Sequence, residues 1–180
     1  MRSILITGAA GSGTTTLATV LARELRMTHL EAGDCFWLLS DPPYQHRVDS
    51  EQRHENLLSD MRSHKRTVVA GSIMRWGAQL ENVFDLVVFL YLPAHLRLPR
   101  LEAREAARFG KVNSEFLAWA ADYDNGSAGR SLIRHQEWLS NRACPVLKLE
   151  GDMSVKDRLA SVLGAVDALS YGRTTTESIR

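Results

Sequence analysis

Short runs of apolar, β-branched residues alternate along the chain with longer stretches in which apolar residues recur with helical periodicity. Five of the short runs predict strands, at residues 3–7, 28–30, 67–70, 85–92 and 145–149. Residues 86–90 are apolar without interruption, which is typical of a strand that helices cover on both faces. The pattern therefore predicts an α/β fold with a parallel sheet, in which this fourth strand is internal.

The longer stretches predict helices. The first is expected over residues 14–26, because four apolar side chains share one of its faces: Leu17, Val20, Leu21 and Leu25. Others are expected from a cap at Asp49 or Ser50 to about His64, and over residues 94–109, 113–122 and 127–141. The last begins at a capping box of Ser154 and Asp157 and is expected to end near Leu169. We expect one domain over residues 1–170 and a flexible tail over residues 171–180, which has little to bury.

The composition of the 180 residues supports one globular domain, with 44% hydrophobic and 24% charged residues. The formal net charge of +1 argues against nucleic acid or a membrane surface as a general partner. Cys35 and Cys144 form no CxxC pair, and the six histidines lack metal-ligand spacing. The longest apolar run is far shorter than the ~20 residues that span a bilayer. We therefore expect a cytoplasmic protein, either a monomer or a homodimer.

A glycine-rich segment directly follows the first predicted strand and directly precedes the first helix. It comprises Gly8, Ala9, Ala10, Gly11, Ser12, Gly13, Thr14, Thr15 and Thr16. Glycines let consecutive backbone N–H groups turn around an anion, and a helix N-terminus adds its positive dipole end. The spacing is that of the phosphate-binding motif GxxxxGK[ST], with Thr15 as the hydroxyl that holds Mg²⁺ and Thr14 in place of the lysine. The segment is therefore predicted to bind a polyphosphate.

Two other interpretations of this segment stay open but are disfavoured. A nicotinamide dinucleotide site would need different glycine offsets, and no tyrosine precedes a lysine by four residues. A strand-to-helix turn without a ligand would not need three glycines and four small hydroxyl residues, which cost conformational entropy. The chain also lacks the NKxD motif of guanine recognition, so a GTPase is not expected.

With this loop, the chain resembles the P-loop small-molecule and nucleotide kinases, which include adenylate, cytidylate and shikimate kinases. It is similar above all to a branch that carries GSGTTT in place of GSGKT, and archaeal-type cytidylate kinases have a similar loop. The resemblance extends from Ile4 to about Leu169. It implies a three-layer P-loop NTPase fold, a five-stranded parallel sheet in the order 2-3-1-4-5, and a helical lid over about residues 97–135. It also implies ATP and Mg²⁺ as cofactors.

Arginines are expected to replace the charge of the missing lysine. Four of them recur with helical spacing and are predicted to share one helix face: Arg97, Arg100, Arg104 and Arg108. In the kinases that this chain resembles, lid arginines close over the phosphates and stabilise the transferred group. The hypothesis is that Arg104 and Arg108, with Arg100, are catalytic, and that Arg130 and Arg134 are second candidates. The alternative is a solvated face on which Glu102 and Glu105 pair with the arginines.

The acceptor is expected beyond the carboxyl ends of the strands, where ligands bind in parallel sheets. By resemblance, Asp34 orients the acceptor hydroxyl, and Glu31 is the weaker candidate. Arg47 and Arg53 are expected to bind an anionic group of the acceptor. Further candidates in the same region are Gly71 and Ser72 for close backbone approach, the proline-containing segment Asp41, Pro42, Pro43 and Tyr44, and, for stacking or packing, Trp37, Tyr44 and Trp76.

On the nucleotide side, the resemblance adds Gly151 and Asp152 to the loop residues. Magnesium is expected to be held by Thr15, water and Asp34, because Asp85 stands at the start of its strand, the wrong end for the site. Together these residues predict an ATP-dependent phosphotransferase that moves the γ-phosphoryl group of Mg·ATP to a small, anionic metabolite or nucleotide. The alternatives are a non-catalytic nucleotide-binding sensor, which would be a degenerate kinase, and an ATPase.

Overall fold

Five parallel strands form one sheet in the order β2-β3-β1-β4-β5, as predicted. The strands are β1 (Ser3–Gly8), β2 (Thr28–Glu31), β3 (Thr67–Ala70), β4 (Leu86–Tyr91) and β5 (Val146–Glu150). The computed structural model describes residues 1–38, 46–126, 129 and 131–177. Several residues with a predicted role lie outside these described residues: Asp41, Pro42, Pro43, Tyr44, Arg130 and the last three of the chain.

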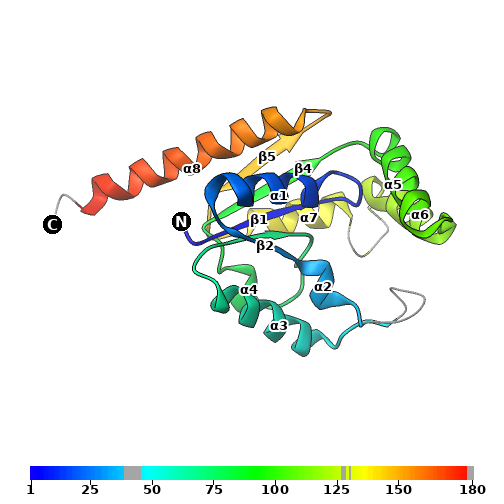
Figure 1. Ribbon diagram of the computed structural model, residues 1–180, viewed down its shortest axis with the longest axis horizontal. Coiled ribbons are helices and arrows are strands. Elements are labelled where there is room, and N and C mark those ends of the chain that lie inside the picture. Colours follow the sequence, from blue (N-terminus) through cyan, green and yellow to red (C-terminus); the bar gives the residue numbers. More distant parts are fainter. Residues whose placement is uncertain (39–45, 127–128, 130, 178–180) are drawn as a thin grey trace.

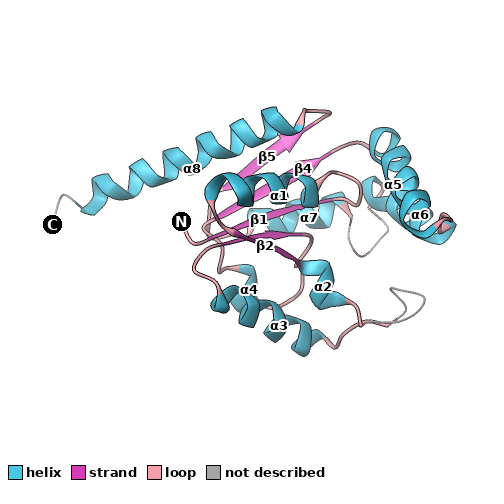
Figure 2. Cartoon of the chain, viewed as in Figure 1, coloured by secondary structure: helices cyan, strands magenta, loops and turns pink. Residues whose placement is uncertain are grey.

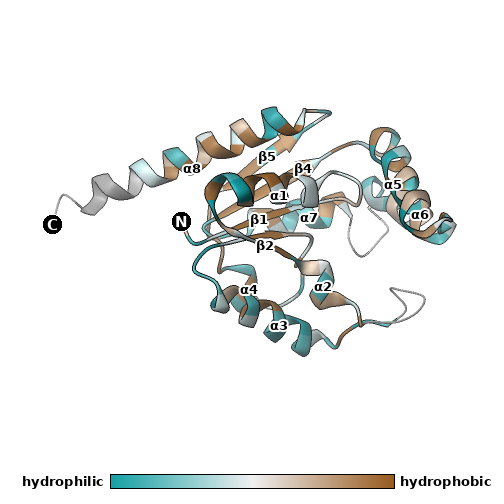
Figure 3. Cartoon of the chain, in the orientation of Figure 1, coloured by the Kyte–Doolittle hydropathy of each residue, from teal (hydrophilic) through white to brown (hydrophobic). Residues whose placement is uncertain are grey.

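Helices cover both faces of the sheet, which gives three layers (Figure 1). On one face lie α1 (Thr14–Leu25) and α8 (Val155–Glu177), and on the other lie α3 (Ser50–Ser63), α4 (Ala78–Glu81) and α7 (Leu132–Ser140). Successive residues of β1 face opposite layers, because Ile4 and Ile6 pack in the core below α1 and Leu5 packs in the core below α3. Figure 3 shows the resulting apolar strands between more polar helices.

The interior position of β4 agrees with its uninterrupted apolar sequence. It pairs with β1 on one side and with β5 on the other. Its residues 86–90 are at most 1% exposed, because helices cover both of their faces.

A group of short elements lies beyond the carboxyl ends of the strands, in the range for which a lid was expected. α5 (Ala94–Phe109) and α6 (Ser114–Ala121) pack against each other (Figure 2). The short η1 (Asp122–Asp124) follows α6 directly. Asn113 caps α6 by accepting a hydrogen bond of 3.1 Å from the N–H of Phe116. The residues for which a helical lid was expected, about 97–135, therefore form most of α5, all of α6 and η1, and the first residues of α7.

Several helix boundaries differ from the prediction. α2 (Ala32–Phe36) and α4 are too short to show helical periodicity and were not predicted. α7 begins at Leu132 and not at residue 127, because Gly129 is unfavourable in a helix and Ser131 occupies the N-cap. α8 begins with the predicted capping box but continues past Leu169 to Glu177, since extending a helix costs less than starting one. Among the described residues, no helix is both long and apolar enough to cross a bilayer.

Candidate active site

The glycine-rich loop joins the carboxyl end of β1 to the N-terminus of α1. Gly13 precedes the helix in the left-handed region, with φ 93°, and no side chain caps the helix. The first turn of α1 carries no acidic residue either. Its backbone N–H groups are therefore left to bind an anion, and the helix dipole favours a negative charge at this end.

Close packing holds the loop in this shape. A Cβ atom at Gly8 would overlap the carbonyl oxygen of Leu90 in β4. Gly11 has φ +84°, and a Cβ atom there would lie 2.8 Å from the carbonyl oxygen of Arg97 in α5. The end of β4 and the start of α5 therefore fix the loop, and glycine is required where they approach it.

Thr15, the predicted magnesium ligand, lies beside a carboxylate. This carboxylate belongs to Glu31 at the end of β2, and Nε2 of His29 lies 2.9 Å from Oε1 of Glu31. Burial raises the pKa of the Glu31 carboxyl, and the neighbouring Thr15 hydroxyl and His29 oppose that rise. Hydroxyl and carboxylate oxygens are the ligands that Mg²⁺ prefers, so this pair fits the ion.

Asp34 lies nearby but is placed differently from the expectation. It is exposed on α2, three residues beyond the end of β2, and it acts on Glu31 only as a neighbouring negative charge. The carboxylate beside Thr15 is therefore Glu31, which the sequence analysis named only as the weaker candidate for orienting the acceptor. The signal for it was its position at the carboxyl end of β2, closer to the sheet than Asp34.

A cavity of about 150 Å³ brings the loop together with residues from four other parts of the chain. Gly71 and Ser72, which follow β3 and were predicted to approach the acceptor, line it together with Thr14. The remaining lining residues come from the loop, α6, η1 and α7: Gly8, Ala9, Ala10, Trp119, Tyr123 and His135. The Ser72 hydroxyl is buried without a hydrogen-bond partner among the described residues.

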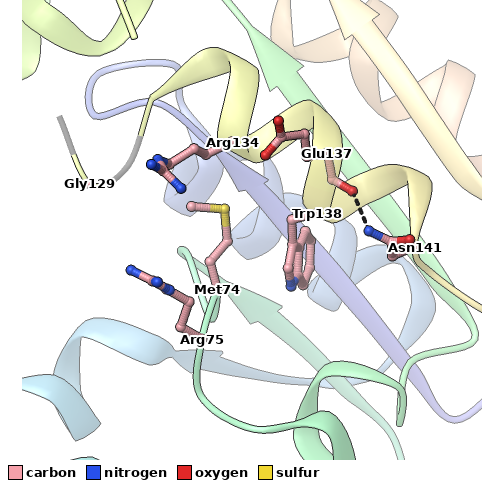
Figure 4. Close-up of a pocket in the computed structure, with 7 residues that line it drawn as sticks. All are labelled: Met74, Arg75, Gly129, Arg134, Glu137, Trp138 and Asn141. Atoms are coloured by element: carbon pink, nitrogen blue, oxygen red, sulfur yellow. Dashed lines mark hydrogen bonds between the residues drawn. The ribbon is translucent and has the colours of Figure 1, made fainter. Parts of the chain in front are cut away.

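A second cavity, of about 220 Å³, lies between α7 and the segment after β3 (Figure 4). Met74 and Arg75 line one side, and Arg134, Glu137 and Trp138 line the other. In the described part of the chain, neither Arg75 nor Arg134 has a hydrogen-bond or ion-pair partner. Two unpaired guanidinium groups at one cavity favour an anionic ligand.

Comparison with known proteins identifies the family to which this site belongs. A family model described as "AAA domain" matches residues 4–117. The uncharacterized protein YqaC of Bacillus subtilis (strain 168) is 36% identical over 173 residues, which cover 90% of this chain and 96% of YqaC. The chain belongs to this family and is a P-loop kinase-like protein.

Two further comparisons, one of sequence and one of fold, are with named kinases. The cytidylate kinase of Methanoregula boonei is 28% identical over 118 residues, which cover 57% of this chain and 60% of that enzyme. The shikimate kinase of Acinetobacter baumannii, solved in complex with shikimate, superposes with a TM-score of 0.58. It is 16% identical, and the match covers 93% of this chain and 94% of that one, which shows a common fold.

The four arginines on α5 of this P-loop kinase-like protein have the spacing of one helix face, but they differ in burial. Arg97 is fully buried on the row that also holds Leu101 and Glu105. Its guanidinium donates to the carbonyl oxygen of Ala120 and lies 3.4 Å from Asp124. These contacts direct the guanidinium of Arg97 towards α6 and η1, so this side chain ties α5 to the two elements that follow it.

The other three arginines of α5 are exposed on the adjacent row. Arg100 binds both carboxylate oxygens of Asp152, at 2.8 and 2.9 Å, and Arg104 lies 3.0 Å from Glu105. The guanidinium of Arg108 lies over the ring of Phe109. The ion pair between Arg104 and Glu105 agrees with the alternative of a charged, solvated face. The bond between Arg100 and Asp152 joins α5 to the segment after β5, and both residues were predicted site residues.

Arg47 and Arg53 lie among aromatic rings. Both guanidinium groups pack on Phe36, at 5.8 and 5.0 Å from the ring centroid. Arg53 also lies 5.2 Å from the ring of Trp76, which is 4% exposed and belongs to the core. Of the two interpretations of Trp76, packing is therefore correct, and cation–π contacts fix both arginines beside α2.

Two other residues differ in whether they belong to the site: Asp85 lies outside it and Arg158 lies against the loop. Asp85 accepts hydrogen bonds from the N–H groups of Arg2 and Ser3, at the end of the sheet opposite the loop, as predicted. Arg158 of α8, which the sequence analysis missed, donates to the carbonyl oxygen of Ser12 inside the loop at 2.7 Å. The signal was the capping box at Ser154, because it places the first turn of α8 at the same end of the sheet as the loop.

Proposed function

We propose that the protein is an ATP-dependent phosphotransferase that moves the γ-phosphoryl group of Mg·ATP to a hydroxyl of a small, anionic acceptor. The observation that carries this proposal is the cavity of about 150 Å³, because the phosphate loop and the residues after β3 line one space. Donor and acceptor bound on these two sides meet within it, which is the arrangement that phosphoryl transfer needs.

On the donor side, the N–H groups of residues 13–16 bind the phosphates, as the uncapped start of α1 supports. Thr15 and Glu31 hold Mg²⁺, directly or through water, and the ion supplies positive charge that neutralises the transferred group. Gly151 and Asp152 approach the nucleoside from the loop after β5, which is near the phosphate loop because Arg158 donates to both.

On the acceptor side, Gly71 and Ser72 face the reacting hydroxyl, and the partnerless Ser72 hydroxyl is ready to bind it. Asp34 orients the acceptor from α2. Arg75 and Arg134 bind its anionic group in the cavity of about 220 Å³, and Arg47 and Arg53 add positive charge nearby.

The exposed arginines of α5 act when the lid closes. Arg104 and Arg108 turn towards the transferred phosphoryl group, and Arg100 exchanges its Asp152 partner for a phosphate oxygen. Such an exchange is feasible because surface ion pairs contribute only about 0–1 kcal/mol. Charge-assisted hydrogen bonds from arginine then stabilise the transition state.

The proposal is tested first by calorimetric titration with ATP, with and without Mg²⁺, with NAD as a control ligand. Micromolar, Mg²⁺-dependent binding of ATP alone is expected. ADP release is then measured in the presence of candidate acceptors that carry a hydroxyl and an anionic group. Release that depends on an acceptor supports a kinase, release that is independent of every acceptor indicates an ATPase, and binding without release indicates a sensor. No ATP binding by folded protein overturns the proposal.

The anionic acceptor is tested with matched arginine variants once an acceptor is known. Arg134→Gln is expected to raise the KM for the acceptor about tenfold or more and to leave the KM for ATP unchanged, because one charge-assisted hydrogen bond is lost. Arg62→Gln, on the exposed end of α3, is the control. An unchanged acceptor KM in Arg134→Gln removes the second cavity from the acceptor site.

A further inference from the structure

The phosphate loop lacks a lysine, yet a buried cation lies against it. Lysine occurs only at positions 65, 111, 148 and 156, none of them in the loop. Arg158, in the first turn of α8, is 5% exposed and reaches the loop across 146 positions of sequence. Nη1 donates to the carbonyl oxygen of Ser12 at 2.7 Å, and Nη2 donates to the carbonyl oxygen of Gly151 at 3.1 Å.

The contact has a direction that matters for a bound anion. The carbonyl of Ser12 and the N–H of Gly13 belong to the same trans peptide group, so they point in opposite directions. A cation that binds the carbonyl from outside polarises this peptide and makes the Gly13 N–H a stronger donor on the other side. The guanidinium lies close enough to do so, because a Cβ atom at Gly13 would stand 3.2 Å from Nη1.

Among the described residues, the guanidinium of Arg158 has no ion-pair partner, and its Nε is buried without a hydrogen-bond partner. Burial and the charge of Arg100 lower the pKa of Arg158, although arginine stays protonated at neutral pH. The negative charge of Asp152 opposes this lowering, but this carboxylate is already paired with Arg100.

Buried charges are normally paired, because removing an unpaired ion from water is costly. The missing partner of Arg158 has to be negative, and the nearest feature built to hold a negative group is the loop itself. The exposed arginines of α5 differ, since Arg100 and Arg104 already pair with carboxylates in this structure.

We propose that Arg158 supplies, through the Ser12–Gly13 peptide, the positive charge that the loop lacks at Thr14, and that it is a positioning residue for the polyphosphate. This inference rests on the proposed function for the identity of the ligand. The charge of Arg158 is present before the lid closes, whereas Arg104 and Arg108 act only in the closed state.

The test compares Arg158→Gln and Arg158→Lys with the parent protein by calorimetric titration with ATP, adenosine and inorganic tripolyphosphate. Arg158→Gln is expected to lower the affinity for ATP and for tripolyphosphate about ten- to a hundredfold. The affinity for adenosine should not change, because the lost charge interacts only with the phosphates. Arg158→Lys should keep part of the affinity. Arg66→Gln is the matched control, because Arg66 also bridges two backbone carbonyls, those of Met1 and Leu25, at the far end of the sheet.

A second variant separates charge from loop structure. Thr14→Lys is expected to restore most of the ATP affinity in the Arg158→Gln background and to add much less to the parent protein. Unchanged ATP affinity in folded Arg158→Gln overturns the inference, and so does an equal loss for ATP and adenosine, which indicates a purely structural role. Failure of Thr14→Lys to restore binding also counts against it.

The outcomes keep this inference distinct from the proposed function. Binding of tripolyphosphate but not ATP, with dependence on Arg158, supports the inference while the proposed function fails. Binding of ATP that ignores Arg158 supports the proposed function while the inference fails. If the folded parent protein binds neither ligand, both are overturned.

Discussion

The side-chain hydroxyl of Thr7, near the end of β1, lies 3.0 Å from Nε2 of His135 in α7. On the other side of the ring, Nδ1 of His135 lies 2.9 Å from the hydroxyl of Tyr123 in η1. All three side chains are buried, at no more than 5% exposure. This chain of hydrogen bonds ties the elements around the phosphate-loop cavity to the central sheet.

Replacing His135 with phenylalanine is expected to lower the free energy of unfolding by about 2–4 kcal/mol, because two buried hydroxyl groups lose their partner while the volume is retained. Tyr123→Phe removes one of the two bonds and should cost about 1–2 kcal/mol. Urea unfolding measures both values. His95→Phe, at an exposed position of α5, is the control and should change stability by less than about 0.5 kcal/mol. Equal stabilities for His135→Phe and the parent protein would contradict the prediction.

Arg97 and Arg104 look alike in the sequence, but their variants should behave in opposite ways. Arg97→Met leaves Asp124 without its buried partner and is expected to lower the free energy of unfolding by about 2–4 kcal/mol. Arg104→Ala removes a side chain that is 53% exposed and should change stability by less than about 1 kcal/mol while lowering kcat at least about tenfold. Urea unfolding and ADP release measure the two effects. Unaltered kcat in Arg104→Ala would leave only the solvated-face interpretation.

A methyl group on the phosphate loop should have a different effect from one on an exposed helix. Gly11→Ala places a Cβ atom against the carbonyl of Arg97 at a positive φ, so ATP affinity is expected to fall by at least about tenfold and stability by about 1–3 kcal/mol. Gly164→Ala in α8 meets nothing within 4 Å and should stabilise the protein by about 0.5–1 kcal/mol. Calorimetry and urea unfolding report both. Normal ATP binding by Gly11→Ala would show that the loop tolerates a new shape.

The sheet and the loop were predictable because their signals are local. Each strand is a short apolar run, and the order follows from the resemblance that the Gly8 to Thr16 segment supports. The capping residues Asp49, Asn113 and Ser154 also lie within three residues of the groups they bond, so helix starts were found correctly. Periodicity missed α2 and α4, which have too few residues to show it, and it did not fix the start of α7 or the end of α8.

The parts of the site that were missed depend on contacts between distant segments. Arg158 and Arg97 look like surface arginines in the sequence. The capping box at Ser154 indicates at which end of the sheet α8 begins, but it does not show that Ser12 will accept a hydrogen bond from Arg158, and no local pattern pairs Arg97 with Asp124. Spacing alone put Arg97 with Arg100, Arg104 and Arg108, but the buried row of α5 is set by what packs on it. Burial that arises from tertiary packing is therefore what separates a structural arginine from an exposed one in this chain.

The start of α3 gives a prediction for acidic pH. Asp49 caps the helix by accepting a hydrogen bond of 2.9 Å from the N–H of Glu51, and this bond lowers the pKa of Asp49 from its ordinary value of 3.8. A lowered pKa means that the unfolded chain binds the proton more tightly, so the contribution is complete above pH 3.8 and is lost as the pH falls through the folded value. Asp49→Ala should therefore have a lower urea midpoint than the parent protein at about pH 6, and the gap should shrink at about pH 3. Asp49→Asn keeps an oxygen acceptor without a titrating group, so the difference between its urea midpoint and that of Asp49→Ala should be the same at both pH values. If the difference between the parent protein and Asp49→Ala also stays the same at both pH values, the cap does not depend on the ionised carboxylate.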